Sequence, residues 1–254
     1  MQSVERQVIA IEKYGPAKSL KLKQRPADPV GDDDVAIAVK YSGINFADIQ
    51  MRLGFYPDAP KRPFVPGYEV SGTVRQVGKN VSRFKVGDPV VAGTYFGGYA
   101  SQVTVPAIQA FALPASNDLA SAAALPVSFF TAQLALFEMG RIRAGDRVLI
   151  ECATGGVGTL AVQMAKHVGA QVVGLTTTAS KKEYIAALGA TPYTREEFFA
   201  DPSVGGFDFI LQASGGKEIR RQLPRLGLTG RMVCMGLNSG VKDSKFFIGG
   251  VFGQ

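Results

Sequence analysis

The chain has 254 residues, of which 46% are hydrophobic and 19% are charged, and its net charge is +7. These proportions are typical of a globular protein with a sizeable core, and the length suits one large domain or two ordinary ones. The charge is spread evenly, since residues 1–118 hold 14 basic and 11 acidic residues and the remainder hold 14 and 10. Without a basic tail or stripe, nucleic acid is disfavoured as a partner, and an anionic cofactor or substrate accounts for the charge equally well.

The sequence has no feature of a secreted or membrane-anchored protein. Its first ten residues, MQSVERQVIA, lack an apolar signal core, and no apolar run reaches 18 residues. The two cysteines, Cys152 and Cys234, lie in apolar, strand-like runs, which predicts two buried thiols and no disulfide framework. We therefore expect a soluble, cytoplasmic protein without a membrane span.

Residues 1–118 are expected to form a β-rich domain. No long helix is predicted there, which favours a compact, barrel-like fold. Gly, Pro and Asp turns separate the strand candidates, which are Val35–Val39, Tyr68–Val74, Pro89–Thr94, Ala100–Pro106 and Ala110–Leu113.

Residues 119–254 have a different pattern, in which helices and strands alternate. Asn117 or Asp118 could cap a short helix over Ala120–Ala124, and a second helix is predicted over Val127–Met139. Such β-α-β order predicts a parallel, doubly wound sheet. Its later elements are a strand at Phe207–Gln212, a helix at Lys217–Leu226 and a strand at Arg231–Met235.

The most informative stretch is Arg147–Lys182, which reads as strand, glycine turn, helix and strand. The turn is Ala153-Thr154-Gly155-Gly156-Val157-Gly158. Such a turn lets backbone approach a pyrophosphate closely, and the helix N-terminus offers free N–H groups. We therefore expect a dinucleotide here, although Ala153 replaces the first glycine of the usual G-x-G-x-x-G pattern. The alternative is a glycine-rich turn that binds nothing.

The end of the second strand predicts which dinucleotide binds. NAD sites usually carry Asp or Glu about 20 residues past the glycines, on the ribose hydroxyls. No acid occurs between Gln171 and Lys182, where the chain reads Thr176-Thr177-Thr178-Ala179-Ser180-Lys181-Lys182. Hydroxyls and lysine suit a 2′-phosphate, which predicts NADPH over NADH. The alternative is that the two lysines form only the solvated start of the next helix.

Several motifs together resemble one family. The motifs are Ser42-Gly43-Ile44-Asn45-Phe46-Ala47-Asp48, Arg52-Leu53-Gly54-Phe55-Tyr56-Pro57, Val65-Pro66-Gly67-Tyr68-Glu69-Val70-Ser71-Gly72, Gly87-Asp88-Pro89-Val90, Ala122-Ala123-Ala124-Leu125-Pro126, Thr131-Ala132 and the glycine turn. With them the chain resembles the zinc-independent medium-chain dehydrogenases/reductases of the quinone oxidoreductase, zeta-crystallin-like family, which are related to the enoyl reductases of polyketide synthases.

The resemblance implies an α/β fold with a GroES-like β-barrel domain at residues 1–118, which holds substrate. A Rossmann domain with a doubly wound parallel sheet follows at residues 119–254 and binds NADPH. Family chains normally continue past the position of Gln254, so the chain is expected to be truncated at its C-terminus. A homodimer is a further option, provided that the missing segment is present.

The resemblance also implies an absence of zinc. Asn45 occupies a ligand position of the zinc-dependent relatives, and Tyr68 stands where they have histidine. The single histidine, His167, falls on the helix after the glycine turn, and the two cysteines lie in strands. These residues cannot assemble a tetrahedral zinc site.

Without a metal, activated acceptors are expected, namely quinones and α,β-unsaturated carbonyls that receive a hydride at carbon. The resemblance makes Asn45 and Tyr56 the candidate catalytic residues that stabilise the developing oxyanion, with Tyr68 lining the pocket. The alternatives are that Asn45 stabilises a loop and Tyr56 belongs to a turn. A different class is also open: an NADPH-binding protein with a structural, trafficking or regulatory role and little turnover.

One stretch departs from the family pattern: Gln212-Ala213-Ser214 stands where family members more usually have an acid, at the end of the fourth strand.

The remaining implied contacts are with the cofactor. The implied cofactor contacts are Thr131 with the nicotinamide ribose; Thr154, Gly155, Gly156 and Val157 with the pyrophosphate; Thr177, Ser180 and Lys181 with the 2′-phosphate; Tyr193 with the adenine or the phosphate; and Gly236 and Asn238 on the nicotinamide side.

Overall fold

The computed structural model describes residues 5–114, 118–236, 241–242 and 245–246. The chain divides into two compact units, Met1–Val127 and Ser128–Gln254. The predicted boundary after residue 118 lies earlier, at the start of the short helix α2 (Leu119–Ala122), whose N-cap is Asp118.

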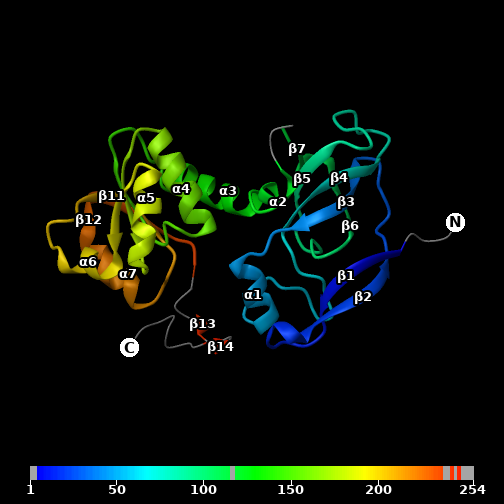
Figure 1. Ribbon diagram of the computed structural model, residues 1–254, viewed down its shortest axis with the longest axis horizontal. Coiled ribbons are helices and arrows are strands. Elements are labelled where there is room, and N and C mark those ends of the chain that lie inside the picture. Colours follow the sequence, from blue (N-terminus) through cyan, green and yellow to red (C-terminus); the bar gives the residue numbers. More distant parts are fainter. Residues whose placement is uncertain (1–4, 115–117, 237–240, 243–244, 247–254) are drawn as a thin grey trace. The chain divides into compact units, whose positions relative to one another are not determined.

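The first unit is built on an antiparallel sheet of five strands in the order β6-β3-β4-β5-β7 (Figure 1). Alternate residues of these strands point inward, so Val35, Ile37 and Val70 join one buried apolar cluster. The five strands are β3 (Asp34–Ser42), β4 (Glu69–Val77), β5 (Pro89–Gly93), β6 (Gln102–Pro106) and β7 (Ala110–Ala112).

A hairpin of β1 (Glu5–Ile11) and β2 (Leu20–Pro26) was not expected from the sequence. Isolated bridges from Val8 to Ala100 and from Ile11 to Phe64 connect it to the rest of the unit. Most of β2 is exposed, and the apolar–polar alternation of its sequence, LKLKQRP, stops after Leu22, which is too short a pattern to mark a strand.

One helix in this unit was also missed, α1 (Phe46–Leu53). It ends at Gly54, which adopts the left-handed conformation with φ 84° that favours glycine. Met51 and Leu53 are its buried apolar residues, and with only eight residues the amphipathic face is too short to stand out in the sequence. Two short 3-10 turns, η1 (Ala17–Ser19) and η2 (Ala107–Gln109), complete the unit.

The second unit contains a parallel sheet of five strands in the order β10-β9-β8-β11-β12. Helices alternate with these strands along the chain, as the sequence predicted for a doubly wound sheet. The strands are β8 (Arg147–Ile150), β9 (Gln171–Thr176), β10 (Thr191–Thr194), β11 (Phe207–Gln212) and β12 (Leu226–Cys234). The helical segments are α3 (Pro126–Gln133), η3 (Leu134–Met139), α4 (Gly156–His167), η4 (Ala179–Lys181), α5 (Lys182–Ala187), α6 (Arg195–Ala200), α7 (Lys217–Gln222) and η5 (Leu223–Arg225).

Both faces of this sheet are buried. Val148 and Ile150 of β8 join the cluster that includes α4, whereas Leu149 between them joins the cluster around Phe198 of α6. Successive residues of a strand point to opposite faces, so one short apolar run supplies both cores.

Two predicted helices need correction in detail. The helix predicted over Val127–Met139 is α-helical only to Gln133 and continues as the π-helical η3. The helix predicted over Lys217–Leu226 ends at Gln222, because Pro224 lacks the N–H that a longer helix needs and Leu226 already begins β12.

The prediction of two buried thiols was wrong. Cys152 is half-buried and Cys234 is exposed, since the first follows the end of β8 and the second is the last residue of β12. Partial desolvation, and to a lesser extent the negative charge of Glu151, raise the pKa of the Cys234 thiol although the residue is exposed. A search for a membrane-crossing helix among the described residues finds none of sufficient length and apolar character.

Candidate functional site: a glycine turn and two buried carboxylates

The turn after β8 is tightly built. Cys152 has a positive φ of 54°, and its carbonyl accepts a hydrogen bond from the Gly155 N–H at 2.9 Å. A Cβ atom on Gly158 would lie 2.1 Å from the Cys152 carbonyl oxygen, a distance that excludes any side chain. Gly158 is therefore required for the close approach of α4 to the end of β8.

No side chain caps the N-terminus of α4. Gly155 is its N-cap residue and has no side chain to accept from the first-turn N–H groups. The helix continues for 12 residues to His167, long enough for a substantial dipole. An uncapped N-terminus after a glycine turn suits a phosphate group.

A cavity of about 220 Å³ opens beside this turn. It is smaller than the roughly 300–1,000 Å³ of typical ligand pockets, so it would hold one part of a dinucleotide. Four residues predicted to contact the cofactor are brought together here: Thr154, Gly155, Thr177 and Lys181. The other lining residues are Glu151, Cys152, Leu175, Thr176, Thr178 and Arg195.

The other predicted cofactor residues do not line this cavity. Gly156 and Val157 are the first residues of α4, Ser180 is exposed in η4, Thr131 is half-buried on α3, and Gly236 follows β12. Tyr193 packs on Phe198, with ring centroids 6.4 Å apart. Asn238 lies outside the described residues.

The two lysines differ in their surroundings. Lys181 lines the cavity, whereas Lys182 begins α5 and its ammonium group forms an ion pair of 2.7 Å with Glu197. The helix-start alternative therefore describes Lys182, and Lys181 is the one of these two lysines that lies at the cavity.

Glu151, which the sequence reasoning missed, is fully buried at the end of β8. Its Oε2 accepts from the Gln212 amide and from the N–H groups of Ala213 and Ser214, each at 2.9 Å. Its Oε1 accepts from the Ser214 hydroxyl at 2.9 Å and from Arg195 Nη2 at 3.1 Å. A charged residue inside an otherwise apolar strand was the signal that could have revealed it.

This network accounts for Gln212 at the end of β11. Its amide donates to Glu151, and its Oε1 accepts from the Gly215 N–H at 2.9 Å. The carboxylate is thus supplied by β8, and the neighbouring β11 supplies the donors. An acid at both positions would put two buried negative charges side by side, which is costly.

In the first unit, Asn45 is held by a second buried carboxylate. Asn45 Nδ2 donates to Glu69 Oε1 at 2.7 Å, and Glu69 Oε2 accepts from the Val127 N–H at 2.8 Å. Burial raises the pKa of Glu69, and these two hydrogen bonds oppose that rise. Asn45 is also the N-cap residue of α1, and its N–H donates to Asp48 at 2.8 Å.

Tyr56 and Tyr68 lie together, with ring centroids 6.1 Å apart, in an aromatic cluster that includes Phe96. Burial raises the pKa of Tyr68, and its hydrogen bond to Tyr56 raises it further.

In the part of the chain that the structure describes, no three His, Cys, Asp or Glu side chains gather as a metal site would require. The carboxylates of Asp48 and Glu69 are occupied by hydrogen-bond donors, and His167 lies at the end of α4. These residues do not fit a bound zinc ion.

Comparison with known proteins identifies both units. The family model for the alcohol dehydrogenase GroES-like domain matches residues 31–115, and the model for the zinc-binding dehydrogenase domain matches residues 156–252. A GroES-like domain followed by a Rossmann domain is the domain pair of the medium-chain dehydrogenases/reductases.

Individual relatives narrow this class. The quinone oxidoreductase of Sus scrofa is 34% identical over 237 residues, which cover 90% of this chain and 72% of the relative. The synaptic vesicle membrane protein VAT-1 homolog of Rattus norvegicus is 35% identical over 232 residues, or 88% of this chain. The chain spans 57% of the length of that relative.

Solved structures agree with these matches. The CurK enoyl reductase is 30% identical with a TM-score of 0.84, and the match covers 91% of this chain and 74% of that one. A mycobacterial protein solved in complex with NADPH is 28% identical with a TM-score of 0.81, over 91% and 74% of the two chains. The chain belongs to the quinone oxidoreductase family of medium-chain dehydrogenases/reductases, which confirms the resemblance and the fold expected from the sequence.

Proposed function

We propose that this protein is an NADPH-dependent oxidoreductase that transfers a hydride to a quinone or an α,β-unsaturated carbonyl without zinc. The observation that carries the proposal is the cavity beside the glycine turn, where Lys181 and the threonine hydroxyls line a space next to the uncapped N-terminus of α4. Both features suit a phosphorylated dinucleotide.

The residues of the second unit fit this cofactor. When bound, NADPH supplies the hydride. The turn at Thr154–Gly158 would hold the pyrophosphate, and Thr177, Ser180 and Lys181 would hold the 2′-phosphate. The roles given to Thr131, Tyr193, Gly236 and Asn238 stay predictions. A relative solved with NADPH supports the choice of cofactor.

The first unit supplies the groups for the acceptor. Glu69 fixes the Asn45 amide through one of its two hydrogens, and the other remains to stabilise negative charge on an acceptor oxygen. Tyr56, which neighbours Tyr68 in the aromatic cluster, can donate its phenol proton to that oxygen. These neutral donors replace the Lewis acid of a zinc enzyme, so the acceptor must already be activated by conjugation.

Steady-state kinetics test the proposal. Purified protein should oxidise NADPH with a quinone or an enone as acceptor, and NADH should be a much poorer donor. Lys181→Ala should raise KM for NADPH about 10-fold, as expected for the loss of one charge-assisted hydrogen bond, and leave KM for NADH nearly unchanged.

Variants of the acceptor groups complete this test. Asn45→Ala and Tyr56→Phe should lower kcat by about 10²-fold or more with KM for NADPH unchanged, since each removes an interaction with the developing charge. Tight NADPH binding with no turnover on either acceptor class would contradict the proposal and would favour a binding protein with a structural or regulatory role.

A further inference from the structure

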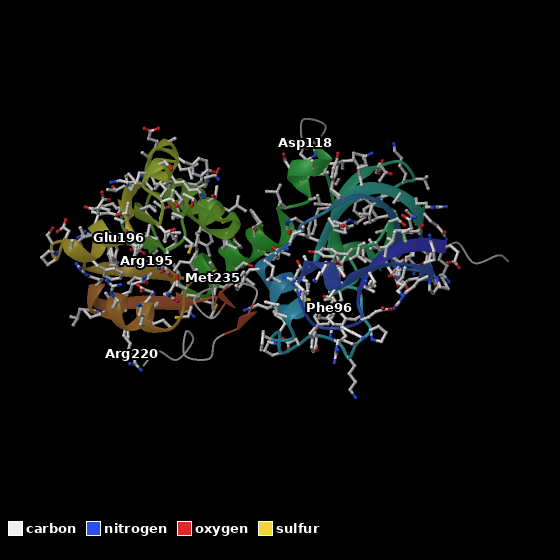
Figure 2. The ribbon with its side chains drawn as sticks, turned by 60° about the horizontal axis from the view of Figure 1, so that its bottom comes forward. Phe96, Asp118, Arg195, Glu196, Arg220 and Met235 are labelled. Carbon is white, nitrogen blue, oxygen red and sulfur yellow. The ribbon has the colours of Figure 1, made fainter. Side chains whose placement is uncertain are left out.

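Arg195 lies in the same cavity as Lys181, but the sequence reasoning assigned it no role. It is the first residue of α6, directly after β10 (Figure 2). Its Nη2 donates to Glu151 Oε1 at 3.1 Å and to the Ser214 hydroxyl at 2.9 Å. One end of the guanidinium is thereby fixed to the carboxyl ends of β8 and β11.

The rest of the guanidinium lacks partners among the described residues. Arg195 Nε is buried and has no hydrogen-bond acceptor. Buried N–H groups of folded proteins are almost always hydrogen-bonded, so Arg195 has unused donor capacity, although Nε itself contacts no solvent and only the exposed part of the side chain can meet a ligand in the cavity. The side chain is 25% exposed, which leaves it accessible to such a ligand.

The carboxylate of Glu151 has no hydrogen-bonding capacity left for that ligand. A carboxylate has about four lone-pair sites, and Glu151 accepts five hydrogen bonds from Gln212, Ala213, Ser214 and Arg195. It is therefore saturated by protein donors and cannot act as the acid that binds ribose hydroxyls in NAD sites. The positive charge of Arg195 offsets the negative charge of Glu151, so the additional positive charge of Lys181 gives the cavity lining a net positive charge.

We infer that Arg195 is a second cofactor-specificity residue, which binds the 2′-phosphate of NADPH together with Lys181, while Glu151 and Ser214 are positioning residues that hold its guanidinium in place. This inference rests on the proposed function, because it takes NADPH as the ligand of the cavity. Arginine suits the task, since its planar group can offer two parallel N–H donors to phosphate oxygens.

Calorimetric titration tests the inference without turnover. The ligands are NADPH and NADH, and the fragments 2′,5′-ADP and 5′-ADP, which differ in the 2′-phosphate alone. Arg195→Gln should weaken NADPH and 2′,5′-ADP by about 10- to 100-fold and NADH and 5′-ADP by less than about threefold. Arg195→Lys should restore part of the loss, because it keeps the charge but not the fork of donors.

The positioning role has a separate test. Ser214→Ala removes one of the two acceptors that fix Arg195 Nη2 and should weaken NADPH by about threefold or more, with NADH unchanged. Glu151→Gln should act in the same direction, and NADH binding reports whether either variant is folded. Lys182→Gln is the matched control: this lysine is paired with Glu197 outside the cavity and should leave all four affinities unchanged.

The outcomes separate this inference from the proposed function. Equal losses of NADPH and NADH in Arg195→Gln, no loss of either, or a wild type that fails to prefer 2′,5′-ADP over 5′-ADP would overturn the role of Arg195. A wild type that binds 2′,5′-ADP through Arg195 but oxidises NADPH with no acceptor would overturn the proposed function alone.

Discussion

Two buried glutamates, Glu69 in the first unit and Glu151 in the second, have similar structural roles. Glu69 has both oxygens occupied, one by the Asn45 amide and the other by the Val127 N–H at the start of α3. Glu151 is saturated in the same manner by Gln212, Ser214 and Arg195. In each case a carboxylate that contacts no solvent fixes the direction of a polar side chain assigned to ligand binding. Such positions are costly unless fully hydrogen-bonded, so each glutamate ties its neighbours to one geometry.

Glu69→Gln should change how stability depends on pH. The ordinary pKa of a glutamate is 4.5, and burial raises that of Glu69 in the folded protein. The folded state therefore holds this proton more tightly than the unfolded chain. Its contribution to the free energy of unfolding is fully present below pH 4.5 and is lost as pH rises through the raised pKa.

Melting temperatures followed by circular dichroism from pH 4 to pH 8 provide the measurement. The wild type should lose stability more steeply over this range than Glu69→Gln, because glutamine does not titrate. The variant should also be less stable overall, since its NH₂ group replaces one of the two oxygens that accept from Asn45 and Val127. Asp58→Asn is the control, because Asp58 is exposed and should leave the wild-type slope unchanged. Identical slopes for wild type and Glu69→Gln would contradict the prediction.

At the scale of elements, short turns decide where the functional groups lie. Thr194 and Glu197 form a reciprocal capping box at the start of α6, in which Thr194 Oγ1 accepts from the Glu197 N–H at 3.1 Å and Glu197 Oε2 accepts from the Thr194 N–H at 2.8 Å. This cap ends β10 and begins the helix at Arg195. Lys182 of α5 also pairs with Glu197, so α5 is linked to the same cap.

Gly158→Ala should destabilise the second unit by about 1–3 kcal/mol, the usual cost of overpacking. The added Cβ would lie 2.1 Å from the Cys152 carbonyl oxygen, so α4 must move away from the end of β8. Chemical denaturation measures the loss, and NADPH titration should show weaker binding in parallel.

Gly205→Ala is the matched control for this prediction. It lies in the same unit, and its Cβ would meet neighbours at an ordinary 3.8 Å. It should therefore be neutral within about 0.5 kcal/mol. Equal effects of the two substitutions would exclude the close approach at Gly158 as the cause.

At the scale of the whole molecule, cofactor binding should stabilise the unit that holds the glycine turn. A ligand that binds only the folded state at 100 times its Kd adds about 2.7 kcal/mol to the free energy of unfolding. Hydrogen exchange with and without NADPH should slow at the turn after β8 and at the end of β9, which both line the cavity.

The comparison with NADH makes this prediction specific. At equal concentrations NADPH should slow exchange more than NADH in the wild type, and the difference should shrink in Lys181→Ala. Equal protection by both cofactors in the wild type would contradict a site for the 2′-phosphate.

The sequence by itself determined the architecture, because its strongest signals are local. A buried strand, a glycine turn and an apolar helix adjacent in sequence predicted the phosphate end of the nucleotide site. Short strand candidates separated by turns predicted the first sheet, the alternation of strands and helices predicted the second, and the motifs around Asn45 and Tyr68 predicted the family. Local periodicity failed where the pattern was short, as in the exposed strand β2 and the eight-residue helix α1.

The tertiary structure alone decided which distant residues meet. Glu151, Arg195 and Ser214 are separated by 19 to 63 positions, and no local pattern relates them. They come together because parallel strands align their carboxyl ends at one edge of the sheet. The pairing of Asn45 with Glu69 also depends on tertiary structure, because the antiparallel strands β3 and β4 and the helix α1 set the distance between these residues. Packing across the sheet, which periodicity does not encode, determines which charges in this protein are satisfied and which remain for a ligand.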